Sequence, residues 1–217
     1  RPEFREIAPF AFDDFYTRYT IEGNPNLKNA TVHNADLKFE YYPSNGEVIS
    51  VSAFYKKFLN PIESKAVVGT SGSTFSFANA YQSDVVGAEL EVKKSFVNAK
   101  NYFFKHFGLL ANASYIYSKV NLGKENVGQS DNRPLQGQSP YSVNAGIFFE
   151  DKELGLQANL LYNVIGKRIA FVGTDDNPDI YEMPRHTLDF NIQYRFKKNV
   201  ELSLAANDLV NQSILFI

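Results

Sequence analysis

Apolar and polar residues alternate along most of this chain, and the alternation is its strongest structural signal. In residues 187–196 every second residue is apolar, from Leu188 to Phe196, and the residues between them are polar or charged. A period of two is that of a β-strand, whose successive side chains point to opposite faces of a sheet. The same period predicts eight strands. They lie at 31–42, between the turn at 43–46 and Asn60, and at 84–94, 107–118, 141–149, 154–164, 187–196 and 200–207.

The connections between these strands alternate between short and long. Short connections are predicted at 43–46, 151–153 and 197–199. Long connections are predicted at about 59–78, 119–139 and 166–185, and the link at 95–102 is intermediate. Short turns at one rim and long loops at the other indicate an antiparallel up-and-down meander.

Three features favour a transmembrane β-barrel over a soluble β-sandwich, which also alternates. Several strands exceed the usual length of about five or six residues. The apolar faces end in Tyr or Phe, as an interfacial belt would, and the polar faces mix Asn, Ser and Gly with charge, as a wet lumen allows. The predicted fold class is all-β, an antiparallel up-and-down meander forming part of a large transmembrane β-barrel, with the sandwich as the alternative.

Composition narrows the function classes. The chain has 19 Phe and 13 Tyr in 217 residues, but its mean hydropathy is -0.30, so the aromatic residues are dispersed among polar ones. No window approaches about 18 apolar residues, which excludes a transmembrane helix but not membrane strands of about 9–11 residues. A net charge of -2 with mixed signs argues against nucleic acid, and the absence of Cys excludes disulfides and thiolate chemistry.

The sequence also predicts that the eight strands are one partial barrel, spanning 1–217, without a plug domain or closing strands. The inward faces are rich in Gly, Ser and Asn, which are too small to fill the narrow interior of an eight-stranded barrel. The strands at 31–42 and 200–207 are therefore expected to be unpaired edges rather than partners of each other. The segment 1–24 is expected to enter the first strand from the long-loop rim, and 213–217 to begin another outer loop.

Several stretches resemble the barrel region of TonB-dependent receptors, particularly those of Bacteroidota. The matching stretches are RPEFREIAP at 1–9, GNPNLK at 23–28, SAFYKKF at 52–58 with NPIE at 60–63, VGAELE at 86–91 and NDLVN at 207–211. The resemblance spans nearly the whole chain, and GNPNLK is its most specific part.

The resemblance implies a bacterial outer-membrane barrel of about 22 strands that is plugged by a separate N-terminal domain. It implies import of an extracellular nutrient, such as a metal chelate, oligosaccharide or peptide, with outer-membrane lipid, the plug, the TonB complex and a surface lipoprotein as partners. The alternatives are a passive porin, a structural outer-membrane barrel, or a soluble β-sandwich that binds carbohydrate.

Three residues of the VGAELE stretch are candidates for contact with a plug. Gly87 is expected on the lumen side, where a missing side chain lets another backbone approach closely, and Glu89 and Glu91 on that face can pair with plug cations. The alternative interpretation is a glycine kink that relieves barrel curvature, beside two hydrated glutamates.

Two of the long loops contain candidate ligand contacts, because binding residues concentrate on loops that a rigid scaffold positions. The candidates are Arg133, Gln136, Lys167, Arg168, Asp175, Asp176, Asp179 and Tyr181. The alternative is that these are ordinary solvated loop residues.

Neither catalysis nor metal binding is indicated. His33, His106 and His186 are far apart and have no carboxylate at metal-ligand spacing. The run Asp175-x-Asn177-x-Asp179 opens like a calcium loop but lacks the glycine and the final glutamate that such a loop requires, so an ordinary acidic loop is expected. With no GxSxG elbow either, we expect no enzyme activity and no cofactor.

Overall fold

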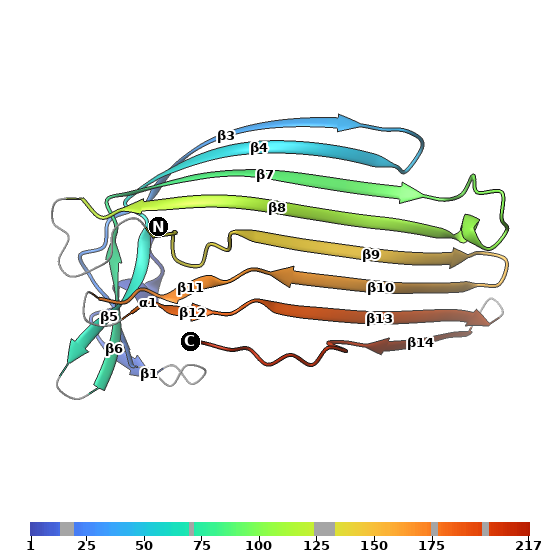
Figure 1. Ribbon diagram of the computed structural model, residues 1–217. Coiled ribbons are helices and arrows are strands. Elements are labelled where there is room, and N and C mark those ends of the chain that lie inside the picture. The colour runs from blue at the N-terminus through green and yellow to red at the C-terminus, as the bar shows by residue number, and fades with distance from the viewer. Residues whose placement is uncertain (14–19, 70–71, 124–132, 175–177, 197–199) are drawn as a thin grey trace.

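The computed structural model describes the chain except for residues 14–19, 70–71, 124–132, 175–177 and 197–199, and its main element is a long antiparallel sheet (Figure 1). Its strands are β3 (Thr31–Tyr41), β4 (Val48–Leu59), β7 (Gln82–Ser95), β8 (Phe107–Asn121), β9 (Tyr141–Asp151), β10 (Leu156–Ile165), β13 (Arg185–Phe196) and β14 (Val200–Ala206). They form one eight-stranded sheet in the order β14-β13-β10-β9-β8-β7-β4-β3. All eight predicted strands are therefore present, each paired with its neighbour in the predicted meander.

The boundary of one strand differs from the prediction for a local reason. β10 begins at Leu156 rather than at 154, because the backbone N–H groups of Glu153 and Leu154 both donate to Oδ1 of Asp151. This Asx-type turn ends at Gly155, whose φ of 67° suits a residue without a side chain. The turn therefore takes two residues that the alternation had assigned to the strand.

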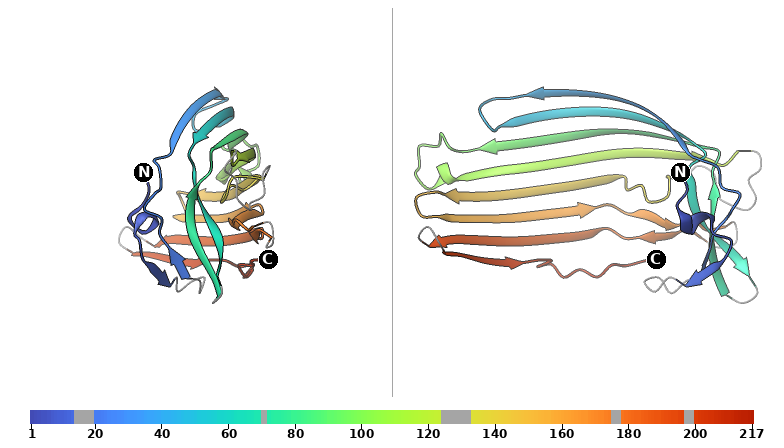
Figure 2. Two further views of the ribbon diagram at one scale, coloured as in Figure 1. Left: turned by 90° about the vertical axis from the view of Figure 1, so that its left-hand side faces the viewer. Right: turned by 180° about the vertical axis from the view of Figure 1, so that it is seen from behind.

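The eight strands form an open, curved sheet (Figure 2). Its two edges are β3 and β14, which do not pair with each other. The prediction that these strands would not close an eight-stranded barrel is confirmed.

The two faces of the sheet differ in polarity as the alternation predicts. The outward face carries large apolar side chains that remain exposed on this wall. They include Leu37, Phe39, Val51, Val86, Leu90, Tyr115, Tyr117, Ile147, Leu160, Tyr194, Leu202 and Leu204. The opposite, inward face carries mainly Ser, Asn and Glu, so that the wall has an apolar outside and a polar inside, as a membrane barrel requires.

The long loops contain strands that the sequence analysis did not predict. β1 (Ala11–Asp13), β2 (Thr20–Glu22), β5 (Ile62–Gly69) and β6 (Gly72–Asn79) form a second sheet, in which β2 and β6 run parallel. β11 (Arg168–Phe171) and β12 (Ile180–Glu182) form a separate hairpin. The short helices are α1 (Phe4–Ile7) and η1 (Phe104–His106), and no helix in the described part of the chain is long and apolar enough to cross a membrane.

The last residues also differ from the prediction, because they pair with β12 instead of beginning a free loop. The backbone groups of Tyr181 and Ile217 exchange hydrogen bonds of 2.7 and 3.0 Å. Between β14 and this pairing, Asp208 and Asn211 have positive φ, which breaks the strand, and Arg185 pairs with Asp208 across the break. Residues 213–217 thus extend the wall toward the long-loop rim.

Candidate functional site: a loop assembly above the inward face

Three of the long connections join into one packed unit, which we call the loop assembly. It consists of the β5–β6 hairpin, residues 133–139 and the β11–β12 hairpin. The rings of Phe75 and Phe171 lie 4.4 Å apart in its interior, and Ile169 and Val172 are almost fully buried beside them. The loop assembly therefore has its own apolar core, which free surface loops do not have.

The loop assembly lies on the inward side of the wall. Ser83 and Val85 of β7 and Ser118 and Val120 of β8 have inward-facing positions in the register, and all four are buried at this end of the strands. The backbone N–H of Leu135 donates to the Ser118 hydroxyl at 3.0 Å, so residues 133–139 cover this part of the face directly. Figure 2 shows the β5–β6 hairpin on the concave side of the sheet, and we therefore assign the polar face to the lumen.

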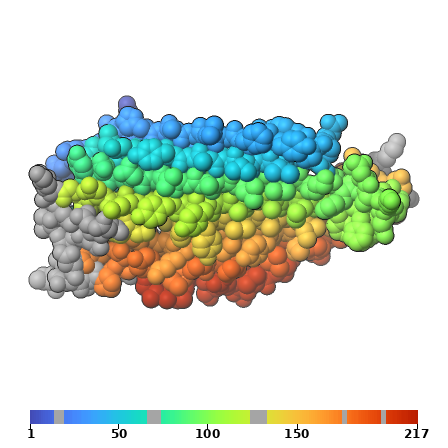
Figure 3. All heavy atoms as spheres, turned by 45° about the horizontal axis from the view of Figure 1, so that its top comes forward, coloured from blue at the N-terminus to red at the C-terminus, as the bar shows by residue number. Residues whose placement is uncertain are grey.

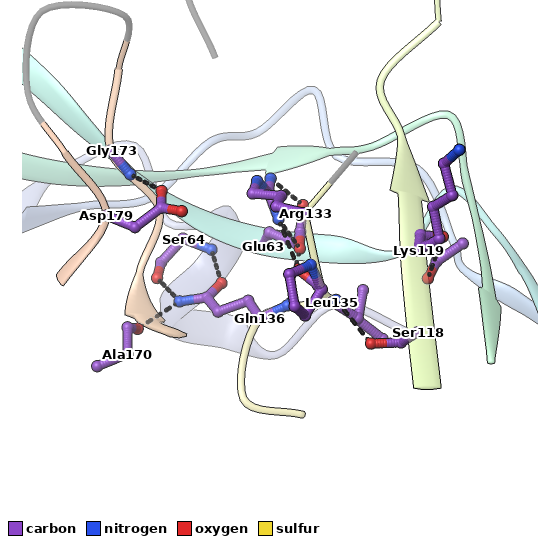
Figure 4. A network of polar contacts seen from close by, with 12 residues as sticks. Glu63, Ser64, Ser118, Lys119, Arg133, Leu135, Gln136, Ala170, Gly173 and Asp179 are labelled. Carbon is purple, nitrogen blue, oxygen red and sulfur yellow. Dashed lines mark hydrogen bonds and ion pairs between the residues drawn. The ribbon is translucent and has the colours of Figure 1, made fainter. Parts of the chain in front are cut away.

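A buried ion pair between Glu63 and Arg133 holds two of these loops together (Figure 4). Nη1 and Nη2 of Arg133 donate to the two carboxylate oxygens of Glu63, each at 2.8 Å. The two side chains are only 4% and 6% exposed, respectively. Two parallel hydrogen bonds fix the geometry of the pair, and burial makes the loss of either partner costly.

Gln136 connects the same loops to the β11–β12 hairpin. Its backbone N–H donates to Glu63, and its side-chain oxygen accepts from the backbone N–H of Ser64 at 2.6 Å. Its side-chain nitrogen donates to the carbonyl of Ala170 at 2.6 Å and to the Ser64 hydroxyl. One side chain therefore bridges β5, residues 133–139 and β11, as Figure 4 shows.

The remaining candidates of the described loops lie on or near the β11–β12 hairpin. Nζ of Lys167 lies 3.8 Å from the centroid of the Tyr181 ring, and Arg168 pairs with Glu182 at 2.7 Å. Asp179 accepts a hydrogen bond from the backbone N–H of Gly173. Burial, and then the nearby Asp179 carboxylate, raise the pKa of the Tyr181 phenol.

The structure therefore brings most of the predicted ligand contacts into one assembly, but they differ in their exposure to solvent. Arg133 and Gln136 are engaged inside the assembly, whereas Lys167 is exposed beside Tyr181. Asp175 and Asp176 lie outside the described residues. Ligand contact remains a prediction for all of these residues. Glu63 was not among the candidates, although it ends the NPIE stretch, because its partner is 70 residues away.

Two rows of polar side chains cross the inward face of the wall. One row of register partners consists of Glu40, Ser50, Glu91, Asn112, Asn144, Asn163 and Thr187. In this row Asn144 donates to Asn112 at 2.7 Å and accepts from Asn163. In the second row Ser52 donates to Glu89 at 3.2 Å. The carboxylates of Glu89 and Glu91 therefore lie within a continuous polar band.

Gly87 lies on the inward face of the wall, and its close neighbour is a side chain of the wall itself. A Cβ atom at position 87 would lie 2.4 Å from Cζ of Phe54 on β4. The same relationship joins Gly108 to Phe148 on β9. Large rings therefore cover both glycines on the inward face. Contact of Gly87, Glu89 or Glu91 with a plug remains a prediction.

The histidines occupy separate places in the structure. His33 is exposed on β3, His106 lies 3.5 Å from Asp151, and His186 shares a 2.6 Å hydrogen bond with Tyr162. In the part of the chain that the structure describes, no three His, Asp or Glu side chains gather as a metal site. Asp175 and Asn177, which begin the run expected to be an ordinary acidic loop, lie outside the described residues.

Comparison with known proteins identifies the family. Residues 4–209 match the family described as TonB dependent receptor-like, beta-barrel. An iron-regulated outer membrane virulence protein of Vibrio cholerae is 23% identical over 227 residues, which cover 98% of this chain and 32% of that protein. The chain thus spans about a third of the length of this curated relative.

Solved structures share the fold at low sequence identity. The copper transporter OprC matches 89% of this chain and 28% of its own, with a TM-score of 0.65 and 18% identity. The ferric yersiniabactin uptake receptor FyuA of Yersinia pestis matches 84% and 25%, with a TM-score of 0.60 and 17% identity. The siderophore receptor PirA of Pseudomonas aeruginosa matches 98% and 34%, with a TM-score of 0.59 and 16% identity. The chain belongs to the TonB-dependent receptor β-barrel family and is part of a bacterial outer-membrane barrel.

Proposed function

We propose that this chain is the wall and part of the extracellular mouth of a receptor that actively imports a nutrient through a plugged lumen. Long loops of outer-membrane barrels are extracellular and short turns periplasmic, which places the loop assembly outside the cell. The observation that carries the proposal is the position of this assembly over the polar inward face. A ligand entering the lumen from outside passes the loop assembly before it reaches the polar band.

The ligand class that we propose is a metal chelate. Support comes from the names of the relatives, which include an iron-regulated protein, a ferric yersiniabactin receptor and a copper transporter. Lys167 and Tyr181 supply a cation and a phenol at the surface of the loop assembly, and these groups suit the anionic oxygen atoms of many chelates. Oligosaccharide and peptide remain the alternatives to be compared in the same experiment.

The coupling that we propose uses a plug domain and the TonB complex, with Glu89 and Glu91 as the wall's contacts for plug cations. Both carboxylates lie on the inward face, where a plug in the lumen would meet them. Their only described cationic neighbour within 4 Å is Lys38, which lies 3.9 Å from Glu91. The polar band therefore contains carboxylates that can pair with cations of a plug.

The test uses the full-length receptor in its own bacterium. Uptake of radiolabelled ferric and copper chelates, an oligosaccharide and a peptide is compared in wild-type cells, in cells lacking this receptor and in cells lacking TonB. We expect uptake of a chelate that is lost in both mutants and that the receptor gene restores only in the cells lacking the receptor. Uptake that depends on the receptor but survives loss of TonB would instead identify a passive pore.

A substitution tests the ligand face in a binding assay. Lys167→Gln should weaken chelate binding to the purified full-length receptor, because it removes the exposed cation beside Tyr181. Lys152→Gln, in the turn between β9 and β10 at the opposite rim, is the matched control and should leave binding unchanged. Equal binding by both variants would remove Lys167 from the proposed site.

A further inference from the structure

The connection between β7 and β8 is built differently from the other periplasmic turns that the structure describes. It covers residues 96–106 and ends in η1, whereas β3 and β4 are joined by 42–47 and β9 and β10 by 152–155. A barrel needs only a short turn at this rim. Figure 3 shows the connection as a green protrusion at one end of the wall, where it extends beyond the strands. Its extra length therefore calls for a role other than joining two strands.

This connection folds back onto the outward face. The Phe103 ring lies 5.0 Å from the ring of Phe107 and 6.0 Å from that of Phe149, and the Phe104 ring lies 6.4 Å from that of Phe107. Phe107 and Phe149 are register partners and belong to the outward set of side chains. Phe103 and Phe104 therefore continue the apolar outer surface of the barrel past the last residues of its strands.

Hydrogen bonds to the strand ends fix the shape of the connection. The backbone N–H of Phe96 donates to the carbonyl of Phe107 at 3.0 Å, and Nδ1 of His106 lies 2.9 Å from the carbonyl oxygen of Glu150. Oδ1 of Asn101 accepts from the backbone N–H of Phe103 at 2.9 Å, which sets the turn that leads into η1. The aromatic side chains are thus held outward by local structure.

Three neighbouring aromatic side chains of this connection are left largely exposed. Tyr102 is 59% exposed, and Phe103 and Phe104 are each 57% exposed. Nζ of Lys105 lies 3.9 Å from the centroid of the Tyr102 ring, the Tyr102 hydroxyl donates to Glu153 at 3.3 Å, and Lys100 is exposed two residues before Tyr102. Aromatic rings flanked by long cationic side chains are the combination that settles at a membrane interface, with the rings among the acyl chains and the ammonium groups at the phosphates.

We propose that Tyr102, Phe103 and Phe104 form an aromatic foot that inserts from the periplasmic rim into the phospholipid interface of the inner leaflet, outside the barrel wall. The occupant is lipid because the foot is continuous with the lipid-facing surface through Phe107 and Phe149. The foot fixes how deeply this part of the barrel lies in the membrane. Lys100 and Lys105 lie at the level of the lipid phosphates.

The test measures the environment of the foot in the full-length receptor, reconstituted in vesicles of phosphatidylethanolamine and phosphatidylglycerol. Phe104→Cys carries an environment-sensitive nitrobenzoxadiazole label, with any other cysteine of the receptor replaced. The matched control is Asn45→Cys in the turn between β3 and β4, an exposed position at the same rim. Each label is quenched in turn by doxyl-labelled lipid and by iodide present on both sides of the membrane.

At position 104 we expect lipid quenching several-fold stronger than at position 45, and iodide quenching several-fold weaker. Labels at both positions that respond equally to iodide would overturn the proposal, because the foot would then lie in periplasmic water. Shielding of position 104 from both quenchers at low receptor density would also overturn it, in favour of a protein partner. Binding of the receptor's ligand serves as the check that both labelled proteins are folded.

Discussion

The ring of Phe54 lies over Gly87 on the inward face of the wall, in the space that a side chain at position 87 would occupy. Cζ of the ring would be 2.4 Å from a Cβ atom placed there. Nζ of Lys56 also lies 5.0 Å from the centroid of this ring. A large side chain on one strand thus covers the bare backbone of the next, an arrangement that shields a glycine within a curved sheet.

Replacing Gly87 should therefore displace Phe54. We expect Gly87→Val to lower the free energy of unfolding by about 1–3 kcal/mol, the usual cost of overpacking. Adding Phe54→Ala should recover part of this loss, because it removes the clashing ring. Ala88→Val, on the exposed outward face of the same strand, is the control and should change stability by less than about 0.5 kcal/mol. Thermal unfolding of the full-length receptor in detergent is measured for the wild type, for these three variants and for Phe54→Ala alone, and additive effects of the two inward substitutions would contradict this relationship.

The Glu63–Arg133 pair should hold the loop assembly together. Arg133→Met leaves a buried carboxylate without its cation, and we expect destabilisation by about 3–5 kcal/mol. The double variant Glu63→Leu with Arg133→Met removes both charges and should be more stable than Arg133→Met alone. Hydrogen exchange at the backbone amides of 62–65 and 135–138 reports the local effect.

A surface pair provides the matched control for this experiment. Arg195 and Glu201 lie 3.0 Å apart on β13 and β14, but both are exposed. Arg195→Met should therefore cost less than about 1 kcal/mol and leave exchange in the loop assembly unchanged. If Arg133→Met behaved like Arg195→Met, the buried pair would not be what holds these loops together.

The periplasmic turn between β3 and β4 should respond to acid. The Lys94 ammonium group at 2.8 Å, with help from Ser44 and the backbone N–H of Ser95, lowers the pKa of the Glu47 carboxyl. A lowered pKa in the folded state stabilises the protein above the pKa of the unfolded state, and this stabilisation is lost as the pH falls through the folded-state pKa.

Glu47→Gln should therefore lower the melting temperature at neutral pH, and its difference from the wild type should shrink in acid. Lys94→Met should show the same trend, since it removes the other member of the pair. The measurement is a series of melting curves of the full-length receptor, taken from neutral pH down to pH values below the folded-state pKa of Glu47. A difference that stays constant at every pH would show that the charge of Glu47 does not matter.

The wall could be predicted from sequence because its signal is local. Each strand repeats a two-residue period between a lipid face and a wet lumen, so strands such as 187–196 are evident without knowledge of their partners. The β5–β6 hairpin was missed because it lies within a segment treated as a single loop. The parallel pairing of β2 with β6 joins residues such as Thr20 and Thr74, and no local pattern indicates such a contact.

The candidate site was predictable only in part for the same reason. Loop length and polarity indicated that Arg133, Gln136, Lys167 and Tyr181 lie in the long loops. The structure brings these residues together in the loop assembly or at its edge. Sequence does not distinguish an exposed cation from one buried against a partner 70 residues away, as Arg133 is against Glu63. The covering of Gly87 by Phe54 likewise depends on the register between two strands.

The most direct test of the barrel wall is the environment of four successive residues on β13. Phe190 and Ile192 are register partners of Leu160 and Ala158 on the outward side, whereas Asp189 and Asn191 belong to the inward side. Spin labels are placed singly at 189, 190, 191 and 192 in the reconstituted full-length receptor, and collisions with oxygen and with a polar nickel chelate are measured. We predict that labels at 190 and 192 favour oxygen and that labels at 189 and 191 favour the polar relaxer. Equal accessibility at all four positions would contradict the assignment of this sheet as a membrane barrel wall.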